Sequence, residues 1–438
     1  MQMDIETKMT RDSDAPDRVR RELLRLLIAA SLGSTLAACG GGGGSTQVPA
    51  EKQPAETGWA LDMRLIAATL IAAHPDPKDV LKSSAWTTAV NKAASGAANR
   101  SFNENLFEAM SLFGLLGDAH TIMLSGPENF GQVPVRFDWI GSNVYVSAAT
   151  QAFASYLGVK LVSIDGMSIP DVMDKIALVR PYYNSAGKQA GSPKWMACAE
   201  FLFLIGVAKS RAGALYSVEM PDGSRQQLQW TIELQPQSLV GIISRNNLPY
   251  WRTRSDSNYW WGTLAGNTVM YLRYFVCSED PRMHLSALMD QVVDSLNQST
   301  SPRLVVDVRG NAGGESALFV NALQGASTKL RSLPKTAILF DRDTFSAGLI
   351  AVFNVKSGLP SARTFGEPSG QALVSPGTVL IKQLPETGLR FQYATTMYSY
   401  DPGNNADTYT PDELIELTLQ DVLVGADPVL TRALAWLN

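Results

Sequence analysis

A serine, a histidine and an acidic residue have the types and surroundings that nucleophilic chemistry needs. Ser346 lies in the segment TFSAG, where a predicted strand ends and a predicted helix begins. A serine there is usually a helix N-cap, but it becomes a nucleophile when a base removes its proton. His120, in the Gly-flanked segment GDAHT, is the best placed of the three histidines to be that base, although alone it is equally typical of a helix C-cap. Asp118, two residues away in an extended segment, points to the same side and is a candidate to orient the ring.

Backbone N–H groups must also be available, because acyl transfer develops negative charge on a carbonyl oxygen. Gly313 and Gly314 end the segment DVRGNAGG over residues 307–314 and let the backbone approach closely. The N–H of Ala347 lies beside Ser346 at a helix N-terminus. These three residues form the predicted oxyanion hole. A tight strand-to-helix turn explains the glycine pair equally well and is compatible with that role.

The elements that position these segments alternate between strand and helix from residue 267 onward. Predicted strands cover 267–274, 303–308 and 335–340, and predicted helices cover 284–296, 316–323 and 346–355. Consecutive units of this kind with apolar strands indicate a largely parallel sheet covered by helices. Sites in such sheets lie at the carboxyl ends of the strands, which is where the segments around Ser346 and Gly313 fall.

The fold class is therefore a multi-domain α/β protein. Helical spacing between residues 59 and 116 predicts two or three helices, strands begin near residue 133, and a further buried helix is predicted over 194–208. The predicted divisions are a signal segment (1–38), a Gly-rich linker (39–57), a helical region carrying His120 (58–130), a small β/α module with connecting strands (131–235) and the core (236–438).

The N-terminus has the pattern of an export signal. Four arginines precede a short apolar run that ends in LAAC at residues 36–39, and glycines fill positions 40–44. Cleavage before Cys39 and acylation of its sulfur would give a lipid anchor. A chance cysteine after an uncleaved helix is the alternative, and the glycine run favours a tether. We expect a lipoprotein of the bacterial cell envelope that faces the periplasm at the outer membrane, exported by the general or the twin-arginine route.

Composition excludes several classes of function. The 438 residues include 37 Lys and Arg against 41 Asp and Glu, without a basic cluster beyond the N-terminus, so nucleic acid is not an expected partner. Three cysteines and three histidines do not provide a disulfide scaffold or a metal-ligand spacing, and we expect no metal and no cofactor. Once Cys39 is acylated, Cys198 and Cys277 remain, and pairing between them is open.

Four motifs in a fixed order give the chain a family resemblance. GDAHT, DVRGNAGG with Val308 in place of Leu, TFSAG, and GEPSG with Ser369 in place of Thr occur along residues 117–370, and a matching tail covers 409–434. Over residues 59–438 the sequence resembles the C-terminal-processing (tail-specific) serine peptidases, and it is most similar to the branch with the tricorn protease core and the interphotoreceptor retinoid-binding modules.

The resemblance implies an endopeptidase that hydrolyses polypeptides through an acyl-enzyme on Ser346, with His120 as general base. It makes Glu367 of GEPSG the first candidate for the acid that orients His120, and Asp118 remains the alternative candidate. The branch with a Ser–Lys dyad has its lysine beyond the nucleophile, where this chain has none; Lys356, ten residues on, points elsewhere. A Glu beside His120 would raise its pKa and place the rise of activity above pH 6.5.

The resemblance also implies that the 136–178 segment is a PDZ-like module, here without an evident Gly-Leu-Gly-type loop for a substrate carboxylate. Two other functions use the same residues. An inactive relative would bind a peptide or an apolar ligand, and an esterase would use the same triad. The oligomeric state is not determined by the sequence.

Overall fold

The computed structural model describes residues 58–233, 238–243, 247–300, 302–359 and 361–438. The predicted signal segment, the Gly-rich linker and Cys39 lie outside the described residues. None of the helices among these described residues combines the length and the apolar character of a membrane span. The class is mixed α/β with several sheets, as predicted.

Three helices open the described chain: α2 (Trp59–Ala73), α3 (Ser84–Ser95) and α4 (Phe102–Leu116). Local sequence sets their ends. Ser83 caps α3 by accepting from the N–H of Trp86, and Ser101 forms a capping box with Glu104 at α4. Gly117 ends α4 in the left-handed conformation at φ 64°, which turns the chain sharply into residues 118–121.

A seven-stranded antiparallel sheet follows, which we call the β-module (residues 131–233 and β8). Its strands run in the order β2-β3-β4-β6-β7, with β5 on β4 and β8 on β3. Three helices accompany the sheet. The bounds of these elements are β2 (Val135–Ile140), β3 (Asn143–Thr150), β4 (Lys160–Ile164), β5 (Met167–Ser168), β6 (Gly213–Glu219), β7 (Arg225–Thr231), β8 (Leu239–Gly241), α5 (Ile169–Ala177), α6 (Ser185–Gly191) and α7 (Ala199–Leu204).

The helix predicted over 194–208 is shorter than the sequence pattern indicated. Pro193 lies in a separate 3-10 turn, Ser192–Trp195, and the α-helix α7 begins only at Ala199. The helix has ended before Gly206, which adopts φ 73°. A proline at the first positions of a turn and a glycine in the left-handed region both interrupt helical hydrogen bonding, and apolar spacing alone does not reveal this.

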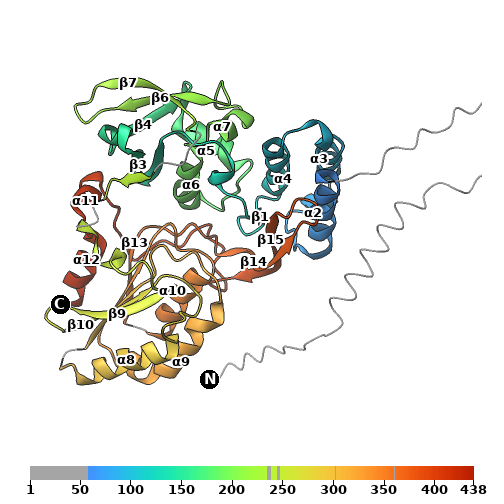
Figure 1. The fold of residues 1–438 in the computed structure, drawn as a ribbon. Helices are drawn as coiled ribbons and strands as arrows, with labels where there is room; N and C mark the ends of the chain where they lie inside the picture. Colours follow the sequence, from blue (N-terminus) through green and yellow to red (C-terminus); the bar gives the residue numbers. More distant parts are fainter. Residues whose placement is uncertain (1–57, 234–237, 244–246, 301, 360) are drawn as a thin grey trace, which may run out of the picture.

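The core is a six-stranded sheet in the order β16-β13-β12-β11-β10-β9, in which all neighbours are parallel except β9 and β10. Helices α8, α9 and α10 pack on one face and α12 on the other (Figure 1). The bounds are β9 (Tyr259–Leu264), β10 (Val269–Tyr274), β11 (Arg303–Asp307), β12 (Thr336–Phe340), β13 (Ala362–Gly366), β16 (Glu413–Leu414), α8 (Leu285–Gln298), α9 (Ser316–Arg331), α10 (Ala347–Gly358), α11 (Leu419–Val424) and α12 (Pro428–Leu437).

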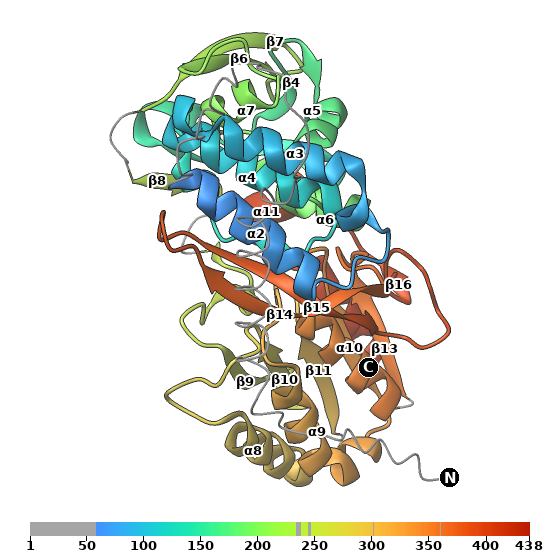
Figure 2. The same cartoon turned by 90° about the vertical axis from the view of Figure 1, so that its right-hand side faces the viewer.

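A long hairpin joins the core to the N-terminal helices. Strands β14 (Val374–Gln383) and β15 (Arg390–Ser399) extend from the core to α2, and both views show them reaching that helix (Figures 1 and 2). The short strand β1 (Ile122–Met123) pairs with β15 in antiparallel fashion. The pairing fixes residues 118–121, just before β1, relative to the core.

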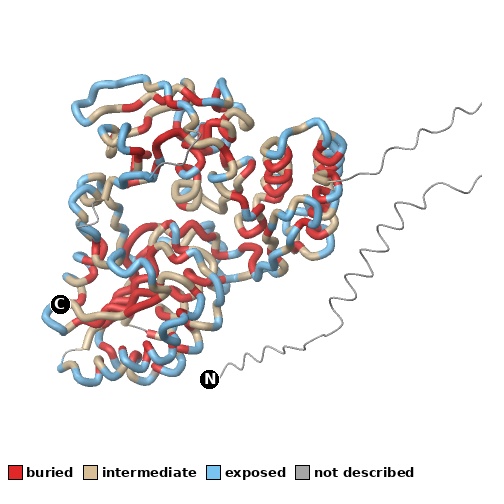
Figure 3. Tube along the Cα trace, in the orientation of Figure 1, coloured by how far each residue is buried: buried red, intermediate tan, exposed pale blue. Residues whose placement is uncertain are grey.

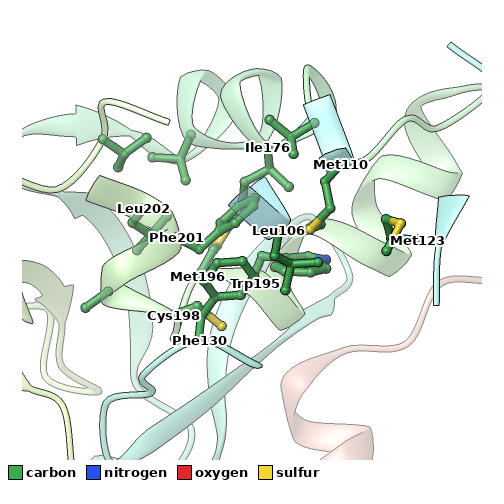
Figure 4. Packing of buried hydrophobic residues seen from close by; sticks show 14 of the residues in the cluster. Leu106, Met110, Met123, Phe130, Ile176, Trp195, Met196, Cys198, Phe201 and Leu202 are labelled. Atoms are coloured by element: carbon green, nitrogen blue, oxygen red, sulfur yellow. The ribbon is translucent and has the colours of Figure 1, made fainter. Parts of the chain in front are cut away.

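Burial is continuous across the elements that hold the site. Figure 3 shows the core strands and the inner faces of the helices as buried. One apolar cluster contains side chains of α4, β1, α5 and α7 together with the hairpin residues Leu384 and Phe391. In Figure 4, Met110 of α4, Trp195 and Phe201 are part of this packing, and Met123 of β1 lies beside them. The N-terminal helices and the β-module therefore share one hydrophobic core.

Candidate active site

Ser346 lies directly before α10, in the loop that follows β12, and its backbone is strained. Its φ and ψ angles are 52° and −126°, values that residues other than glycine rarely adopt. The side chain does not cap the helix, so Ser346 does not play the usual structural role of a serine at this position. Its N–H donates to Oε1 of Gln371 at 3.1 Å. A strained serine between a strand and a helix is an arrangement that exposes a nucleophile.

The glycine loop after β11 lies against this serine. A side-chain carbon at Gly313, which has φ 104°, would come within 2.8 Å of the Cβ of Ser346. Asn311 ties the two loops together, because its carbonyl accepts from Phe345 N–H at 2.9 Å and its side chain accepts from Gly313 N–H at 2.9 Å. Only glycine allows the close approach seen here.

The predicted oxyanion donors differ in their availability. The N–H of Gly313 is already bonded to Asn311. Within the described residues, the N–H groups of Gly314 and Ala347 have no hydrogen-bond acceptor. Ala347 is the first residue of α10, where N–H groups have no acceptor inside the helix. Gly314 and Ala347 are thus the two predicted donors that remain free to bind an oxyanion.

His120 comes to this place through the pairing of β1 with β15. The carbonyl of His120 accepts from Nε2 of Gln392 at 3.0 Å, and Thr121 Oγ1 accepts from the N–H of Ala394 at 2.9 Å. The imidazole ring packs on Phe345, the chain neighbour of Ser346, with ring centroids 4.6 Å apart. Residues separated by more than 200 positions in the sequence therefore meet at one site.

The environment of His120 suits a general base. The residue is 3% exposed, and its Nδ1 lies 2.8 Å from the hydroxyl of Tyr183. Its Nε2 is buried and has no hydrogen-bond partner in the described part of the chain, so no bond to Ser346 is formed in this state. Burial, which outweighs the charge of Asp118, lowers the pKa of His120. The ring is therefore neutral at neutral pH.

Asp118 receives hydrogen bonds on both carboxylate oxygens. Oδ1 accepts from the backbone N–H of His120 at 2.9 Å and from the hydroxyl of Tyr183. Oδ2 accepts from the hydroxyl of Thr121 at 2.5 Å and from Nε2 of His74 at 3.0 Å. Burial raises the pKa of Asp118, but these hydrogen bonds more than offset it and leave the pKa below its ordinary value. Asp118 is therefore an ionised carboxylate beside His120.

Glu367 is held by a different partner. Arg342 donates to its carboxylate from Nε at 2.9 Å and from Nη2 at 2.7 Å. Among the described residues, Glu367 makes no hydrogen bond to His120. The structure therefore brings Asp118, and not Glu367, to the histidine.

Glu367 lines a cleft of about 720 Å³ between the β-module and the core. The lining also includes Trp139 of β2, Arg252, and Asp341 and Arg342 after β12. Burial, with the nearby charge of Asp343, raises the pKa of Asp341 to about 7. The cleft lies at the carboxyl ends of the core strands, where a parallel sheet usually binds its ligands.

The remaining predicted groups lie apart from this cluster. Lys356 donates to the carbonyl of Ala362 and to Asp412, on the far part of α10. Cys198 and Cys277 are both buried and unpaired. Among the described residues, no group of three or more His, Cys, Asp or Glu side chains is arranged to hold a metal ion.

Sequence reasoning missed three residues of the site: Tyr183, His74 and Gln371. Tyr183 lies in the loop between α5 and α6, and no local pattern marks it as functional. His74 is the C-cap of α2, a position that does not by itself indicate a role in a site. The one signal that pointed to His74 was the scarcity of histidine in the chain.

Solved structures resemble this chain over most of its length. The structure of mature CPAF complexed with lactacystin aligns over 84% of this chain and 95% of its own, with a TM-score of 0.55 and 11% identity. Mature CPAF aligns over 87% of this chain and 95% of its own, with a TM-score of 0.54 and 12% identity. The photosystem II D1 C-terminal processing protease aligns over 85% and 99%, with a TM-score of 0.40 and 14% identity. No family sequence model and no curated protein sequence matches the chain.

The chain has the fold of mature CPAF, and its structural neighbours are C-terminal-processing peptidases. The resemblance inferred from the four motifs is thereby confirmed at the level of the fold, and the narrower placement near the tricorn core stays a prediction. The structural neighbours are serine peptidases, which are hydrolases. A fold hosts more than one function, so the activity of this chain depends on the residues of its own site.

Proposed function

We propose that this chain is a serine endopeptidase that cleaves polypeptides through an acyl-enzyme on Ser346, with His120 as general base. The observation that carries the proposal is the state of the His120 ring. Its Nε2 is buried and has no partner among the described residues, while the ring packs on Phe345 beside the strained serine. A buried acceptor nitrogen without a partner is costly, and a hydrogen bond donated by the hydroxyl of a nucleophile would satisfy it.

The proposed reaction has two stages, acylation of Ser346 and hydrolysis of the resulting ester. Nε2 of His120 takes the hydroxyl proton while Oγ of Ser346 bonds to the peptide carbonyl carbon, and the oxyanion is bound by the N–H groups of Ala347 and Gly314. The C–N bond then breaks, and the imidazolium gives its proton to the leaving amine. Water then attacks the ester carbonyl while His120 again takes and returns a proton. This step releases the new carboxyl terminus and restores the hydroxyl of Ser346.

Within this proposal, Asp118 is the acid that serves His120. Its charge lies two residues from the histidine and is fixed by hydrogen bonds on both oxygens. Glu367, paired with Arg342, lines the neighbouring cleft instead, and the lining of that cleft does not include Ser346 or His120. We further propose that the β-module is PDZ-like and receives the polypeptide, because its strand β2 contributes Trp139 to the same cleft.

The decisive experiment combines active-site labelling with a substrate panel. A fluorophosphonate should label wild-type protein on Ser346 and should not label Ser346→Ala, and the wild type should cleave unstructured polypeptides. Hydrolysis of esters without cleavage of any peptide would replace the proposal with an esterase. Peptide binding without labelling or hydrolysis would show an inactive binding protein.

We also propose that the mature protein is a lipoprotein that begins at acylated Cys39 and is anchored in the cell envelope facing the periplasm. The support is the segment LAAC followed by five glycines at residues 40–44. Cys39→Ala should leave the precursor unprocessed or release the protein from membranes. The control is Cys198→Ala, since Cys198 is a buried, unpaired cysteine and its loss should not change fractionation. Wild-type protein that keeps residues 1–39 in the cytoplasm would contradict the proposal.

A further inference from the structure

The carboxylate of Asp118 bonds the backbone N–H of His120, but its bridge to the imidazole ring is the hydroxyl of Tyr183. We propose that Tyr183 is a positioning residue that connects Asp118 to the ring, so that the site acts as a chain from Ser346 through His120 and Tyr183 to Asp118. The inference rests on the proposed function and adds to it a residue that fixes which ring nitrogen acts as the base.

The number of protons decides the direction of each hydrogen bond. A phenol donates one proton and accepts through its oxygen, whereas an ionised carboxylate only accepts. Tyr183 therefore donates to Oδ1 of Asp118, and its oxygen accepts from Nδ1–H of His120 at 2.8 Å. The contact between Tyr183 and the carbonyl of Pro376, at 3.3 Å, is the longer alternative. The proton of the neutral ring thus lies on Nδ1, and Nε2 keeps the lone pair that a general base needs.

His74 completes the arrangement on the other side of Asp118. Its Nδ1 accepts from the N–H of Asp76 at 3.0 Å, so the ring proton lies on Nε2. That nitrogen donates to Oδ2 of Asp118 at 3.0 Å, and Thr121 donates to the same oxygen. The carboxylate is therefore held from both sides, which leaves Oδ1 directed at Tyr183.

Tyr183 itself is fixed by the core. Its ring stacks on Phe345, with centroids 5.9 Å apart and an interplanar angle of 11°. The next residue, Asn184, caps α6 and donates to the carbonyls of Ser369 at 3.0 Å and Asp407 at 2.6 Å. A loop between α5 and α6 is thus anchored to the loops that surround Ser346.

Removal of the Tyr183 hydroxyl has a definite effect on the charge of His120. An oxygen that accepts from Nδ1–H favours the imidazolium, so its loss lowers the pKa of His120. The charged, titratable and polar groups around the ring come from several elements: Asp118 and, behind it, His74; Tyr183 after α5; the carbonyl of Pro376 in β14; and Tyr400 after β15, which lies near Ser346. Nδ1 bonds to Tyr183 and to no other group in the described residues, and the carbonyl of Pro376, which also raises the pKa of His120, stays in place after the substitution.

The test compares Tyr183→Phe with Tyr182→Phe. Both tyrosines are half-buried, but the Tyr182 hydroxyl has no hydrogen bond to Asp118 or His120 within the described residues. Tyr183→Phe should lower kcat on the order of 10²-fold with KM nearly unchanged, as expected when a catalytic group is misplaced. The acidic limb of kcat/KM should also move to lower pH. Tyr182→Phe should keep the wild-type kcat, the wild-type KM and the wild-type pH of the acidic limb.

An unchanged kcat in Tyr183→Phe, or a lower kcat with the acidic limb at its wild-type pH, would overturn the inference. If Tyr183→Phe does not fold, the tautomer is measured instead by ¹⁵N NMR of histidine-labelled Ser346→Ala protein, with His284→Gln as an aid to assignment. The His120 ring should carry its proton on Nδ1, and a proton on Nε2 would contradict the inference. Failure of the proposed function is separate: wild-type protein would then show neither labelling of Ser346 nor hydrolysis.

Discussion

Arg342 holds Glu367 in a two-pronged ion pair, with Nε 2.9 Å from Oε2 and Nη2 2.7 Å from Oε1. Both side chains are largely buried. A planar guanidinium matched to both oxygens of a carboxylate is among the stronger arrangements of a charged pair. The carboxylate of the motif GEPSG is thus paired with an arginine in this structure, whereas the sequence alone made Glu367 the first candidate for the catalytic acid.

The two acids should consequently respond differently to neutralisation. Glu367→Gln should lower kcat by less than about tenfold while lowering the free energy of unfolding by several kcal/mol, since it leaves a buried arginine unpaired. Asp118→Asn should lower kcat on the order of 10²-fold or more, because the acid then no longer stabilises the imidazolium. Steady-state kinetics and urea unfolding of the two variants measure both effects. A crippling Glu367→Gln beside a mild Asp118→Asn would return the catalytic role to Glu367.

Activity should rise with pH through a midpoint below about 6.5, the ordinary pKa of histidine. Burial lowers the pKa of His120 and outweighs the charge of Asp118 and the carbonyl of Pro376, which both raise it. The sequence had predicted a rise above that value. Measurement of kcat/KM against pH decides between the two, and a midpoint clearly above 6.5 would contradict the environment described for the ring.

His120 also makes the free energy of unfolding depend on pH. His120 stays neutral in the folded state to a lower pH than in the unfolded state, so the unfolded chain binds more protons as the pH falls below about 6.5. This contribution is fully present above that pH and decreases as the pH falls toward the folded pKa. His120→Gln should therefore flatten the dependence of unfolding free energy on pH in this window.

Substitutions of Ser346 should separate strain from activity. Ser346→Ala and Ser346→Gly both lack the nucleophile and should lose at least about 10³-fold in kcat/KM. At φ 52° and ψ −126°, alanine keeps the backbone strain and glycine relieves it. Ser346→Gly should therefore be more stable than Ser346→Ala by about 1 kcal/mol. Equal stability of the two variants in urea would show that the strain has no energetic consequence.

Gly314→Ala should damage the oxyanion hole. Gly314 has φ 135°, and a side-chain carbon there would come within 2.3 Å of the carbonyl of Cys277. The loop must shift to avoid that contact, and the displaced N–H should cost kcat on the order of 10²-fold. The control is Gly223→Ala, at φ 82° with no atom within 4 Å, which should cost about 1 kcal/mol of stability and no activity. Wild-type kcat in Gly314→Ala would exclude Gly314 as a donor.

Local sequence patterns were sufficient to predict the core strands and the positions of Ser346 and the glycine loop. The buried strands β10, β11 and β12 have nearly continuous apolar runs, because both faces of a parallel sheet are covered. Parallel strands end at the same edge, so polar and glycine-rich segments that follow them meet there. This information is local, which is why the strand ends, Ser346 and Gly313 could be found from the order of residues.

The side chains that surround His120 depend on contacts between elements far apart in the chain. His74 bonds Asp118 across 44 positions and Tyr183 bonds it across 65, through contacts that depend on the packing of separate elements. Glu367 was drawn to Arg342, 25 positions away, by the same kind of contact. No periodicity or local motif encodes such pairs. They arise because the β14–β15 hairpin pairs with β1 and the loop before α6 is anchored to the core, and together these contacts place four distant segments around one imidazole ring.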